Sequence, residues 1–371
     1  MRYNNFMLSK KILFVSNALA NLVSRQAFFE GLQRNGFEIL TCSPIECPEL
    51  RAHLAFSHHK INFSRSGINP FAELSALKAF VKILKQIKPD IVHIFTLKAI
   101  LFFGLVSRFY KVPSLVLTFT GMGYLYTSPS LRAKILKFLT EQGLRIVLAY
   151  SKTVLSVQNR HDYEHLCSIY PKLRGRVIPG SGIDISTYAP QDHVREKPVI
   201  ILPARMLKDK GVVEFVAAAR CLNGKAKFVL VGGVDLSYPD AISKEQLNKW
   251  VCEGIVEWWG HQSNMKDVYA NADIVCLPSY REGMPRVLLE AASCGLPIVT
   301  TDVPGCRDVV VDGKTGFIVP AQSSRLLANA LEKLIDNKLL CRQMGVKGRE
   351  FVVRHCSVDE IVKQTVDLYQ V

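Results

Sequence analysis

The sequence contains no apolar run long enough to cross a membrane. A membrane-spanning helix needs roughly 18 consecutive apolar residues, whereas the longest interior run, at 99–107, ends at Arg108. Near the start of the chain, two lysines precede the apolar residues 12–15 as in a signal peptide, but the apolar core of such a peptide has roughly 7 to 15 residues. We therefore expect neither a transmembrane helix nor a cleaved signal, and we interpret 12–16 as a buried strand.

The ten cysteines show none of the paired spacing that metal sites and redox centres use. No Cys-x-x-Cys pair occurs, and several cysteines lie inside apolar runs, where a reduced thiol behaves as a small apolar side chain. The sequence also has no Asp-x-Asp motif and no cluster of His, Cys and carboxylate residues at metal-ligand spacing. These absences favour a reducing compartment, the cytoplasm, and an activity that needs no metal and no cofactor.

The excess of positive charge is confined to the first half of the chain. Residues 1–190 contain 24 Lys and Arg against 10 Asp and Glu, a difference of +14, and the remaining residues contain 23 against 22, or +1. Such an excess indicates an anionic partner, which is a nucleic acid, an acidic substrate or an anionic lipid surface. A nucleic acid is disfavoured because neither a helix-turn-helix signature nor an aromatic RNA-binding strand is present.

Short, β-branched apolar runs alternate with longer amphipathic stretches along the chain. In the first half these runs lie at 12–16, 38–42, 60–63, 91–94, 115–119, 153–157 and 176–178. After a polar stretch that contains two prolines, at 188–198, they recur at 199–202, 228–231, 255–258, 274–277, 298–300 and 317–319. Continuous apolar strands separated by helices, such as the helix expected at 71–88, are typical of parallel sheets covered on both faces.

The pattern predicts an α/β protein with two doubly wound, Rossmann-like domains, at 1–190 and 191–371. A length of 371 residues suits two such domains. By analogy with other two-domain folds of this kind, the helical tail returns to the first domain. Ligands bind at the carboxyl ends of the strands in open α/β sheets, so we expect the two domains to face each other across a cleft.

Two basic residues follow the first strand of the second half. The segment 204–211 reads ARMLKDKG and precedes a helix that is expected to begin near Val212. The planar guanidinium of Arg205 can bind two phosphate oxygens, Lys210 adds a mobile positive charge, and the helix N-terminus adds amide donors. This combination predicts a diphosphate site, although two basic loop residues considered alone are typical of a solvated surface.

Two glutamates eight positions apart follow a later strand of the same half. The segment 279–290 reads SYREGMPRVLLE, which places Glu282 in a loop and Glu290 about two turns into a helix. We expect the turn to present backbone amides to anionic oxygens, while the two carboxylates accept hydrogen bonds from the hydroxyls of a sugar and a ribose. The remaining residues expected to bind there are Gly283, Met284, Pro285 and Val287.

The Arg-x4-Lys loop and the Glu-x7-Glu segment together resemble the donor site of glycosyltransferase family 4, whose members are retaining enzymes with the GT-B fold. The likeness extends over most of the chain and is strongest from 199 to 319, which includes LPSYREGMPRVLLEAASCGLPIVTTDVPGCRDVV. Within the family, the chain is most similar to capsule-type and N-glycan-type N-acetylgalactosaminyltransferases that act on sugars linked to undecaprenyl diphosphate.

The resemblance implies a role for each residue that matches a motif. Arg205 and Lys210 would bind the donor diphosphate and stabilise its negative charge as it leaves. Glu282 would contact the transferred sugar, completing the catalytic set, and Glu290 would bind the ribose. The implied donor is a UDP-sugar, the implied acceptor is a lipid-linked saccharide, and the implied location is the cytoplasmic face of the inner membrane.

The first half departs from the family pattern at one position. Many members have a histidine after the fifth strand, where this chain reads TFTGMGY at 118–124. Gly121 and Gly123 would allow a ligand to approach the backbone, unless they only form a turn. With Arg25, which follows the first strand, they are our candidates for acceptor binding. We assign a catalytic role to neither His93 nor His261, because a single histidine is more often part of the packing.

The basic first half gives a second expectation about partners. The segment 131–139 has apolar and basic faces at helical spacing, and together with Lys78, Lys82 and Lys85 it would rest on the anionic surface of the inner membrane. The alternative is a core helix with a solvated charged face.

Other enzyme classes share the two-domain pattern. A transferase with a GDP-hexose or UDP-hexose donor, or with a soluble acceptor, fits the same motifs. A nucleotide-sugar epimerase lacks the combined Arg-x4-Lys and Glu-x7-Glu segments, and a phosphorylase requires a much longer chain.

Overall fold

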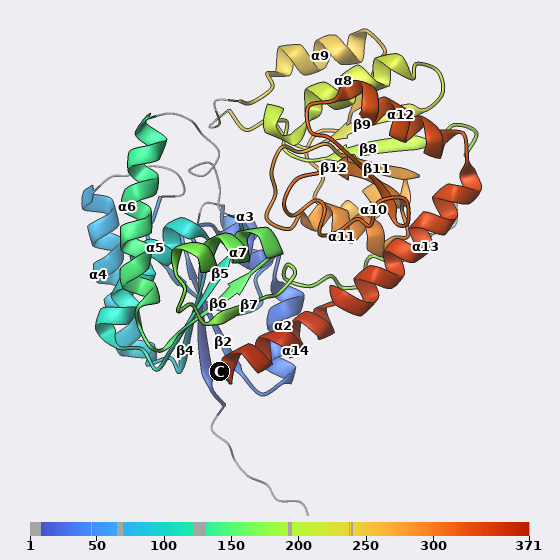
Figure 1. Ribbon diagram of the computed structural model, residues 1–371. Coiled ribbons are helices and arrows are strands. Elements are labelled where there is room, and N and C mark those ends of the chain that lie inside the picture. Colours follow the sequence, from blue (N-terminus) through green and yellow to red (C-terminus); the bar gives the residue numbers. More distant parts are fainter. Residues whose placement is uncertain are drawn as a thin grey trace, which may run out of the picture. The chain divides into compact units, whose positions relative to one another are not determined.

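The computed structural model describes residues 9–45, 47–64, 70–121, 131–191, 195–236, 238 and 240–370, without the side chains of residues 70 and 131–133 (Figure 1). The chain forms two compact units. One comprises Met1–Gly182 with Val358–Val371, and the other comprises Ile183–Ser357.

The N-terminal unit is built on a seven-stranded sheet in the order β3-β2-β1-β4-β5-β6-β7, in which every neighbouring pair is parallel. Its strands are β1 (Lys11–Val15), β2 (Glu38–Ser43), β3 (Ser57–Lys60), β4 (Ile91–Phe95), β5 (Ser114–Phe119), β6 (Thr153–Val157) and β7 (Gly175–Val177). Its helices are α1 (Leu19–Val23), α2 (Gln26–Arg34), α3 (Pro48–Ala52), α4 (Pro70–Ile87), α5 (Leu97–Tyr110), α6 (Leu131–Leu148), α7 (Arg160–Ile169) and α14 (Val358–Tyr369).

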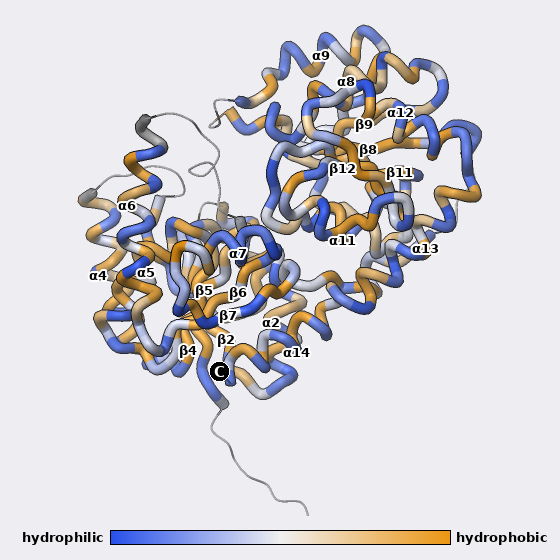
Figure 2. Tube along the Cα trace, viewed as in Figure 1, coloured by the Kyte–Doolittle hydropathy of each residue, from blue (hydrophilic) through white to orange (hydrophobic). Residues whose placement is uncertain are grey.

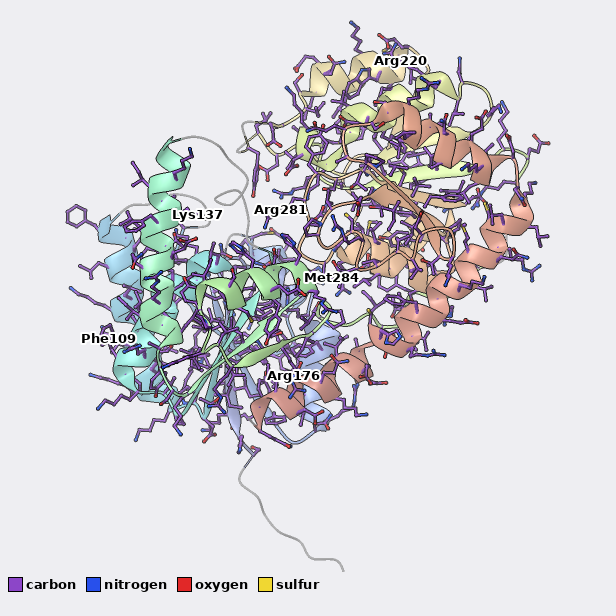
Figure 3. The ribbon with its side chains drawn as sticks, in the orientation of Figure 1. Phe109, Lys137, Arg176, Arg220, Arg281 and Met284 are labelled. Carbon is purple, nitrogen blue, oxygen red and sulfur yellow. The ribbon has the colours of Figure 1, made fainter. Side chains whose placement is uncertain are left out.

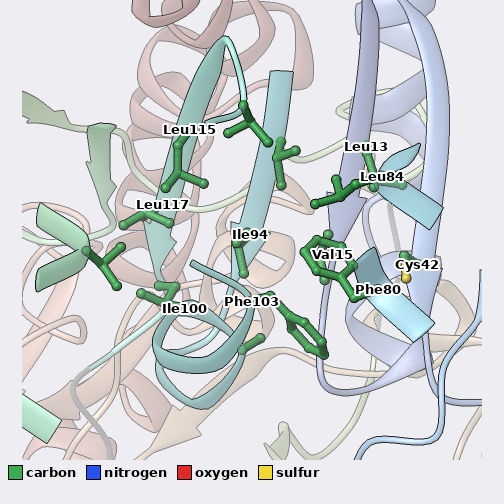
Figure 4. Packing of buried hydrophobic residues seen from close by; sticks show 14 of the residues in the cluster. Leu13, Val15, Cys42, Phe80, Leu84, Ile94, Ile100, Phe103, Leu115 and Leu117 are labelled. Atoms are coloured by element: carbon green, nitrogen blue, oxygen red, sulfur yellow. The ribbon is translucent and has the colours of Figure 1, made fainter. Parts of the chain in front are cut away.

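Both faces of this sheet are buried. Successive residues of β1 enter different apolar clusters: Leu13 and Val15 pack with Phe80 of α4 (Figure 4), whereas Ile12 and Phe14 pack with residues of α2 and α14. Side chains alternate between the faces of a strand, so a strand covered on both sides must be apolar throughout. This is why inner strands of the first half, such as β1 and β4, read as nearly continuous apolar runs.

The C-terminal unit repeats the architecture with a six-stranded parallel sheet in the order β10-β9-β8-β11-β12-β13. Its strands are β8 (Val199–Pro203), β9 (Lys227–Val231), β10 (Glu257–Trp258), β11 (Ile274–Leu277), β12 (Ile298–Thr301) and β13 (Gly316–Val319). Its helices are η2 (Lys208–Lys210), α8 (Val212–Cys221), α9 (Lys244–Cys252), α10 (Met265–Ala270), α11 (Arg286–Ser293), α12 (Ser324–Ile335) and α13 (Lys338–His355). Figure 2 shows hydrophobic strands inside each unit and hydrophilic stretches outside.

The structure divides the chain at 182–183 instead of 190. Residues 183–190 belong to the C-terminal unit because Ile183 forms a parallel bridge with Ser357. The carbonyl oxygen of Tyr188 also accepts hydrogen bonds from Ser293 Oγ and Arg349 Nη1, at 2.6 and 3.1 Å. The polar stretch that suggested a linker therefore begins after the true boundary.

The last helix, α14, packs on α2 of the N-terminal unit. A Cβ atom at Gly31 of α2 would lie 2.6 Å from Cγ2 of Val362, so the small residue allows the two helices to approach closely. Near the end of α14, the hydroxyl of Tyr369 lies 2.7 Å from Nδ1 of His93 in β4. The tail thus belongs to the first unit, as the analogy suggested.

One predicted strand is wrong. The apolar run at 60–63 suggested a strand, but β3 lies at Ser57–Lys60 and pairs with β2, with Leu40 opposite Ser57. Ile61 and Phe63 are buried without belonging to the sheet. Because β3 is a polar edge strand, its own residues gave no apolar signal.

Among the described helices, none has the length and apolar content that a membrane-spanning helix requires.

Candidate functional site

The predicted basic and acidic loops follow two strands that lie side by side in the second sheet. β8 and β11 pair in parallel, with Ile200 opposite Ile274. Residues 204–211 leave the carboxyl end of β8, and residues 278–285 leave the carboxyl end of β11. Since parallel strands end at the same edge of a sheet, the topology brings the two loops together.

Two glycines allow close backbone contacts around these loops. Gly211 has φ = +73°, and a Cβ atom there would lie 2.2 Å from the carbonyl oxygen of Pro278. Gly305 has φ = +83°, and a Cβ atom there would lie 2.6 Å from the carbonyl oxygen of Gly283. A larger residue at either position would force the loops apart and would also adopt an unfavourable backbone conformation.

Lys210 and Glu282 form a mostly buried ion pair at this junction. The Nζ atom of Lys210 donates to Oε1 of Glu282 at 2.7 Å, and the two side chains are 15% and 17% exposed. Burial by itself lowers the pKa of Lys210, but the Glu282 carboxylate outweighs it and raises the pKa above its ordinary value. Lys210 is therefore charged at neutral pH, and the structure brings together two of the three residues predicted to be catalytic.

Arg205, the third of these residues, begins the same loop. Its Nη1 atom lies 3.3 Å from Oδ2 of Asp235, and its guanidinium carbon lies 4.3 Å from the ring centre of Tyr238. The charge of Arg205 also acts on Lys210, where it opposes the effect of Glu282. Two cations therefore lie near one another at this edge of the sheet, which is the charge distribution that suits a diphosphate.

The second glutamate is buried. Glu290 is only 4% exposed on α11. Arg286 Nε donates to its Oε1 at 2.7 Å, and the Tyr269 hydroxyl donates to its Oε2 at 3.0 Å. A carboxylate oxygen accepts more than one hydrogen bond, so the binding of a ribose hydroxyl by Glu290 stays a prediction.

The turn before α11 lies where the sequence predicted it. Pro285 is the N-cap residue with an extended backbone, and α11 begins at Arg286. Met284 and Val287 are partly buried against the core below the turn, and Figure 3 shows Met284 and Arg281 on this loop. Donor binding by Gly283, Met284, Pro285 and Val287 stays a prediction.

In the N-terminal unit, Arg25 points into the protein. It precedes α2, is 9% exposed, donates from Nη1 to the carbonyl oxygen of Asn21 at 2.6 Å, and lies 4.7 Å from the ring centre of Phe95. With His93 and Thr118 it lines a cavity of about 10 Å³, enough for about one water molecule. A diphosphate does not fit there without rearrangement, so acceptor binding by Arg25 stays a prediction.

The other two acceptor candidates are glycines after β5. Gly121 has φ = +128°, a backbone conformation that favours glycine over other residues. Gly123 lies outside the described residues. Acceptor binding by either glycine stays a prediction.

His93 is part of the packing, as expected for a single histidine. It is 2% exposed, and its Nε2 lies 2.6 Å from Oγ1 of Thr118 while its Nδ1 faces Tyr369. Burial, together with the charge of Arg25, lowers the pKa of His93 to about 3. A neutral imidazole with partners on both nitrogens holds α14 against the sheet.

The expectation of a metal-independent site stays a prediction. Within the described ranges, no group of three or more His, Cys, Asp or Glu side chains is arranged to hold a metal ion. Lys210, which contacts Glu282, and Arg205, which contacts Asp235, carry the positive charge predicted to neutralise a diphosphate.

Two family models match the chain, one in each half. The model described as glycosyl transferases group 1 matches residues 187–351, which include both loops of the site, and the model described as glycosyl transferase 4-like matches residues 11–158. The chain belongs to glycosyltransferase family 4. The predicted enzyme class is therefore confirmed.

Two curated relatives of the transferase are similar over most of its length. An N,N'-diacetylbacillosaminyl-diphospho-undecaprenol α-1,3-N-acetylgalactosaminyltransferase of Campylobacter jejuni is 29% identical, over 75% of this chain and 76% of that protein. A UDP-Gal:α-D-GlcNAc-diphosphoundecaprenol α-1,3-galactosyltransferase of Escherichia coli is 27% identical, over 81% of each chain.

Solved structures show that the transferase has the GT-B fold. Sucrose-phosphate synthase from Thermosynechococcus elongatus superposes with a TM-score of 0.80 at 19% identity, covering 97% of this chain and 98% of that one. The Anabaena protein HepE, in complex with UDP and glucose, superposes with a TM-score of 0.77 at 19% identity, covering 96% and 98%. The fold prediction is confirmed.

Sequence reasoning missed four residues that support the transferase's site. The hydroxyl of Ser279 lies 2.9 Å from Oε1 of Glu282, and its position directly after an apolar strand was a usable signal. The Tyr280 hydroxyl donates to Oε1 of Glu214 at 2.6 Å, which ties the acidic loop to α8. Asp235 and Tyr238, the partners of Arg205, lie in a loop that no motif marks.

Proposed function

We propose that this transferase moves an N-acetylhexosamine from a UDP-sugar to a saccharide linked to undecaprenyl diphosphate, with retention of the anomeric configuration. The product would serve bacterial surface polysaccharide or protein-glycan synthesis. The observation that supports the proposal is the junction of two loops at which Arg205, Lys210 and Glu282 lie together. The relatives' names support the choice of lipid-linked acceptor and of an amino sugar.

The chemistry follows from the charges at this junction. As the bond between sugar and diphosphate breaks, negative charge grows on the leaving phosphate, and fixed cations nearby stabilise that charge more than they stabilise the intact donor. Lys210 is mostly buried, so its charge acts in an environment with less water and is weakly screened. Arg205 supplies a planar fork for two phosphate oxygens.

Glu282 would act on the sugar side of the breaking bond. In the structure its Oε1 accepts hydrogen bonds from Lys210 Nζ and, at 2.9 Å, from the Ser279 hydroxyl. When Lys210 pairs with the donor diphosphate instead of with Glu282, the carboxylate can accept a hydrogen bond from a sugar hydroxyl. It can then also stabilise the positive charge that develops at the anomeric carbon. The two cations perform the role of a metal ion, so the proposed reaction is metal-independent.

We place the enzyme on the cytoplasmic face of the inner membrane, attached through the N-terminal unit. Several large apolar side chains are exposed on three neighbouring helices: Phe71 and Leu74 of α4, Phe109 of α5, and Ile135, Phe138, Leu139 and Ile146 of α6. We call these residues the apolar helix surface; Figure 3 shows Phe109 together with Lys137 of α6. Exposed lysines border them at positions 78, 82, 85 and 134.

This combination supports membrane contact over the alternative of a core helix. Phe138 and Leu139 are 59% and 58% exposed, so they are not core residues. A core helix with a solvated charged face would have charged side chains on its outer surface, without large apolar side chains beside them. Apolar side chains enter the lipid interface while nearby lysines bind anionic head groups.

A panel of nucleotide sugars against undecaprenyl-diphosphate-linked acceptors, analysed by product mass, tests the proposed reaction. We expect one UDP-N-acetylhexosamine to add a single residue to the acceptor, with UDP released only when acceptor is present. Arg205→Ala should reduce kcat/KM by about 100-fold to 1,000-fold, as for loss of one charge-stabilising donor. The matched control is Arg220→Ala in α8, whose side chain is 49% exposed and paired with Glu253.

The same panel separates the rival functions. Conversion of one nucleotide sugar into another in the absence of acceptor would indicate an epimerase, and product from a GDP-linked or hexose donor would correct the donor assignment. Unchanged transfer by the Arg205 variant would refute the assigned site.

A further inference from the structure

The loop between β9 and α9 lies along the basic segment that follows β8. The amide of Met206 donates to the carbonyl oxygen of Gly233 at 3.1 Å, and the amide of Ile242 donates to that of Met206 at 2.8 Å. Leu207 and Ala241 form an antiparallel bridge. These contacts fix the two ends of the loop, at Gly233 and at Ala241 and Ile242, relative to the segment that carries Arg205.

Two side chains of this loop contact the Arg205 guanidinium. Oδ2 of Asp235 accepts from Nη1 at 3.3 Å, and the ring of Tyr238 lies 4.3 Å from the guanidinium carbon. Burial by itself lowers the pKa of Arg205, but the Tyr238 side chain and then the Asp235 carboxylate raise the pKa above its ordinary value. Both neighbours therefore favour the charged guanidinium.

The contacts differ in what they fix. The carboxylate fixes one end of the guanidinium fork, while the aromatic ring supports the group through a cation–π contact. A free arginine side chain has many rotamers, and ordering it during ligand binding reduces affinity. An arginine that is already held in place binds a diphosphate without that loss.

We propose that Tyr238 is a positioning residue for the donor diphosphate: its ring, with Asp235 at one end of the fork, holds the Arg205 guanidinium in the orientation that receives phosphate. This inference rests on the proposed role of Arg205 in donor binding. It adds a third loop to the donor site and assigns a function to a segment that lies outside both recognised motifs.

A double-mutant cycle on the full-length chain tests the proposal. The variants are Tyr238→Ala, Arg205→Ala and the two combined, measured by UDP binding in calorimetry and by kcat/KM for the donor. Tyr238→Ala alone should weaken UDP binding by about 3-fold to 30-fold, the range of one cation–π contact. In the Arg205→Ala background the same change should have almost no further effect, because its action passes through Arg205.

Three further measurements distinguish positioning from a general structural role. Tyr238→Phe, which keeps the ring, should fall between wild type and Tyr238→Ala in UDP affinity. The KM for the lipid-linked acceptor should be unchanged in all Tyr238 variants, and their Tm should stay close to that of wild type.

The outcomes separate failure of this inference from failure of the proposed function. An equal loss from Tyr238→Ala with and without Arg205, or a Tyr238→Phe variant as impaired as Tyr238→Ala, would overturn the positioning role while leaving the donor site intact. If Arg205→Ala itself binds UDP and transfers sugar normally, the donor site is wrongly assigned and the inference falls with it.

Discussion

At the scale of single residues, the ion pair between Lys210 and Glu282 affects both the stability of the loop and the stabilisation of the leaving diphosphate. Removing the lysine leaves a carboxylate that is 17% exposed without its cation, which destabilises the loop as well as the leaving diphosphate. Lys210→Ala should therefore lower kcat by about 100-fold to 1,000-fold.

The double variant Lys210→Ala with Glu282→Ala identifies the cause. It should recover part of any Tm lost in the single variant, because the uncompensated charge is gone, but it should recover no activity. Recovery of transfer by the double variant would show that the lysine serves only to neutralise Glu282.

His93 gives a residue-scale prediction about pH. Its pKa is about 3 in the folded protein, because the site is buried, against an ordinary value of 6.5. As the pH falls below 6.5, the unfolded chain takes up a proton that the folded protein does not, so His93 lowers the free energy of unfolding between pH 6.5 and 3.

Urea unfolding of the wild type and a His93→Gln variant at pH 6.5 and 5 measures this effect. We expect wild type to lose about 2 kcal/mol more than the variant over this interval. Equal losses would mean that His93 does not titrate differently in the folded and unfolded states.

At the scale of elements, much of the fold could be predicted from the sequence. Strands such as β1, β5 and β8 are apolar on both faces, so they appear in the sequence as short, continuous apolar runs that could be located directly. β3 was misplaced because an edge strand of polar residues has no such signal.

The site was predictable to the extent that its residues follow strands. Arg205, Lys210 and Glu282 are placed by β8 and β11, which adjoin in the sheet. Asp235 lies 30 positions from Arg205, and no spacing rule links a loop after β9 to one after β8. Such contacts depend on the three-dimensional course of the loops.

The glycine at the junction of the two loops gives an element-scale prediction. Gly211→Ala would place a Cβ atom 2.2 Å from the carbonyl oxygen of Pro278, whereas Gly254→Ala, at a similar φ of +69°, meets nothing within 4 Å. The control should lose only about 1 to 2 kcal/mol of stability, the backbone cost of a left-handed residue.

We expect Gly211→Ala to lose more stability than Gly254→Ala and to reduce sugar transfer at least tenfold, because it separates Lys210 from Glu282. Chemical unfolding and kcat/KM, measured for both variants, check this. Equal effects on stability and transfer would indicate that the close contact with Pro278 has no role.

At the scale of the whole molecule, the charge is divided unequally between the two halves of the sequence. The +14 excess of residues 1–190 lies in the part of the chain that also exposes the apolar helix surface, whereas residues 191–371 carry +1. An excess of positive charge that served only solubility would not require exposed apolar side chains beside it. Its combination with exposed phenylalanines favours attachment to a bilayer that contains anionic lipid.

Vesicle flotation with and without phosphatidylglycerol tests this attachment. Changing Lys78, Lys82 and Lys134 to Gln should weaken binding to anionic vesicles by about 100-fold, at about 1 kcal/mol per lysine near the surface. The matched control changes Lys314, Lys338 and Lys347, three exposed lysines of the C-terminal unit, and should bind as wild type does.

The apolar contribution is tested separately, since salt screens charges but not apolar contacts. Phe138→Ser should reduce binding at both low and high salt, whereas Leu339→Ser in α13, a residue that is 67% exposed, should not. Binding that is equal for neutral and anionic vesicles, or that survives all three lysine changes, would remove the electrostatic account. Loss of binding in the Leu339 variant would instead locate the membrane contact on the C-terminal unit.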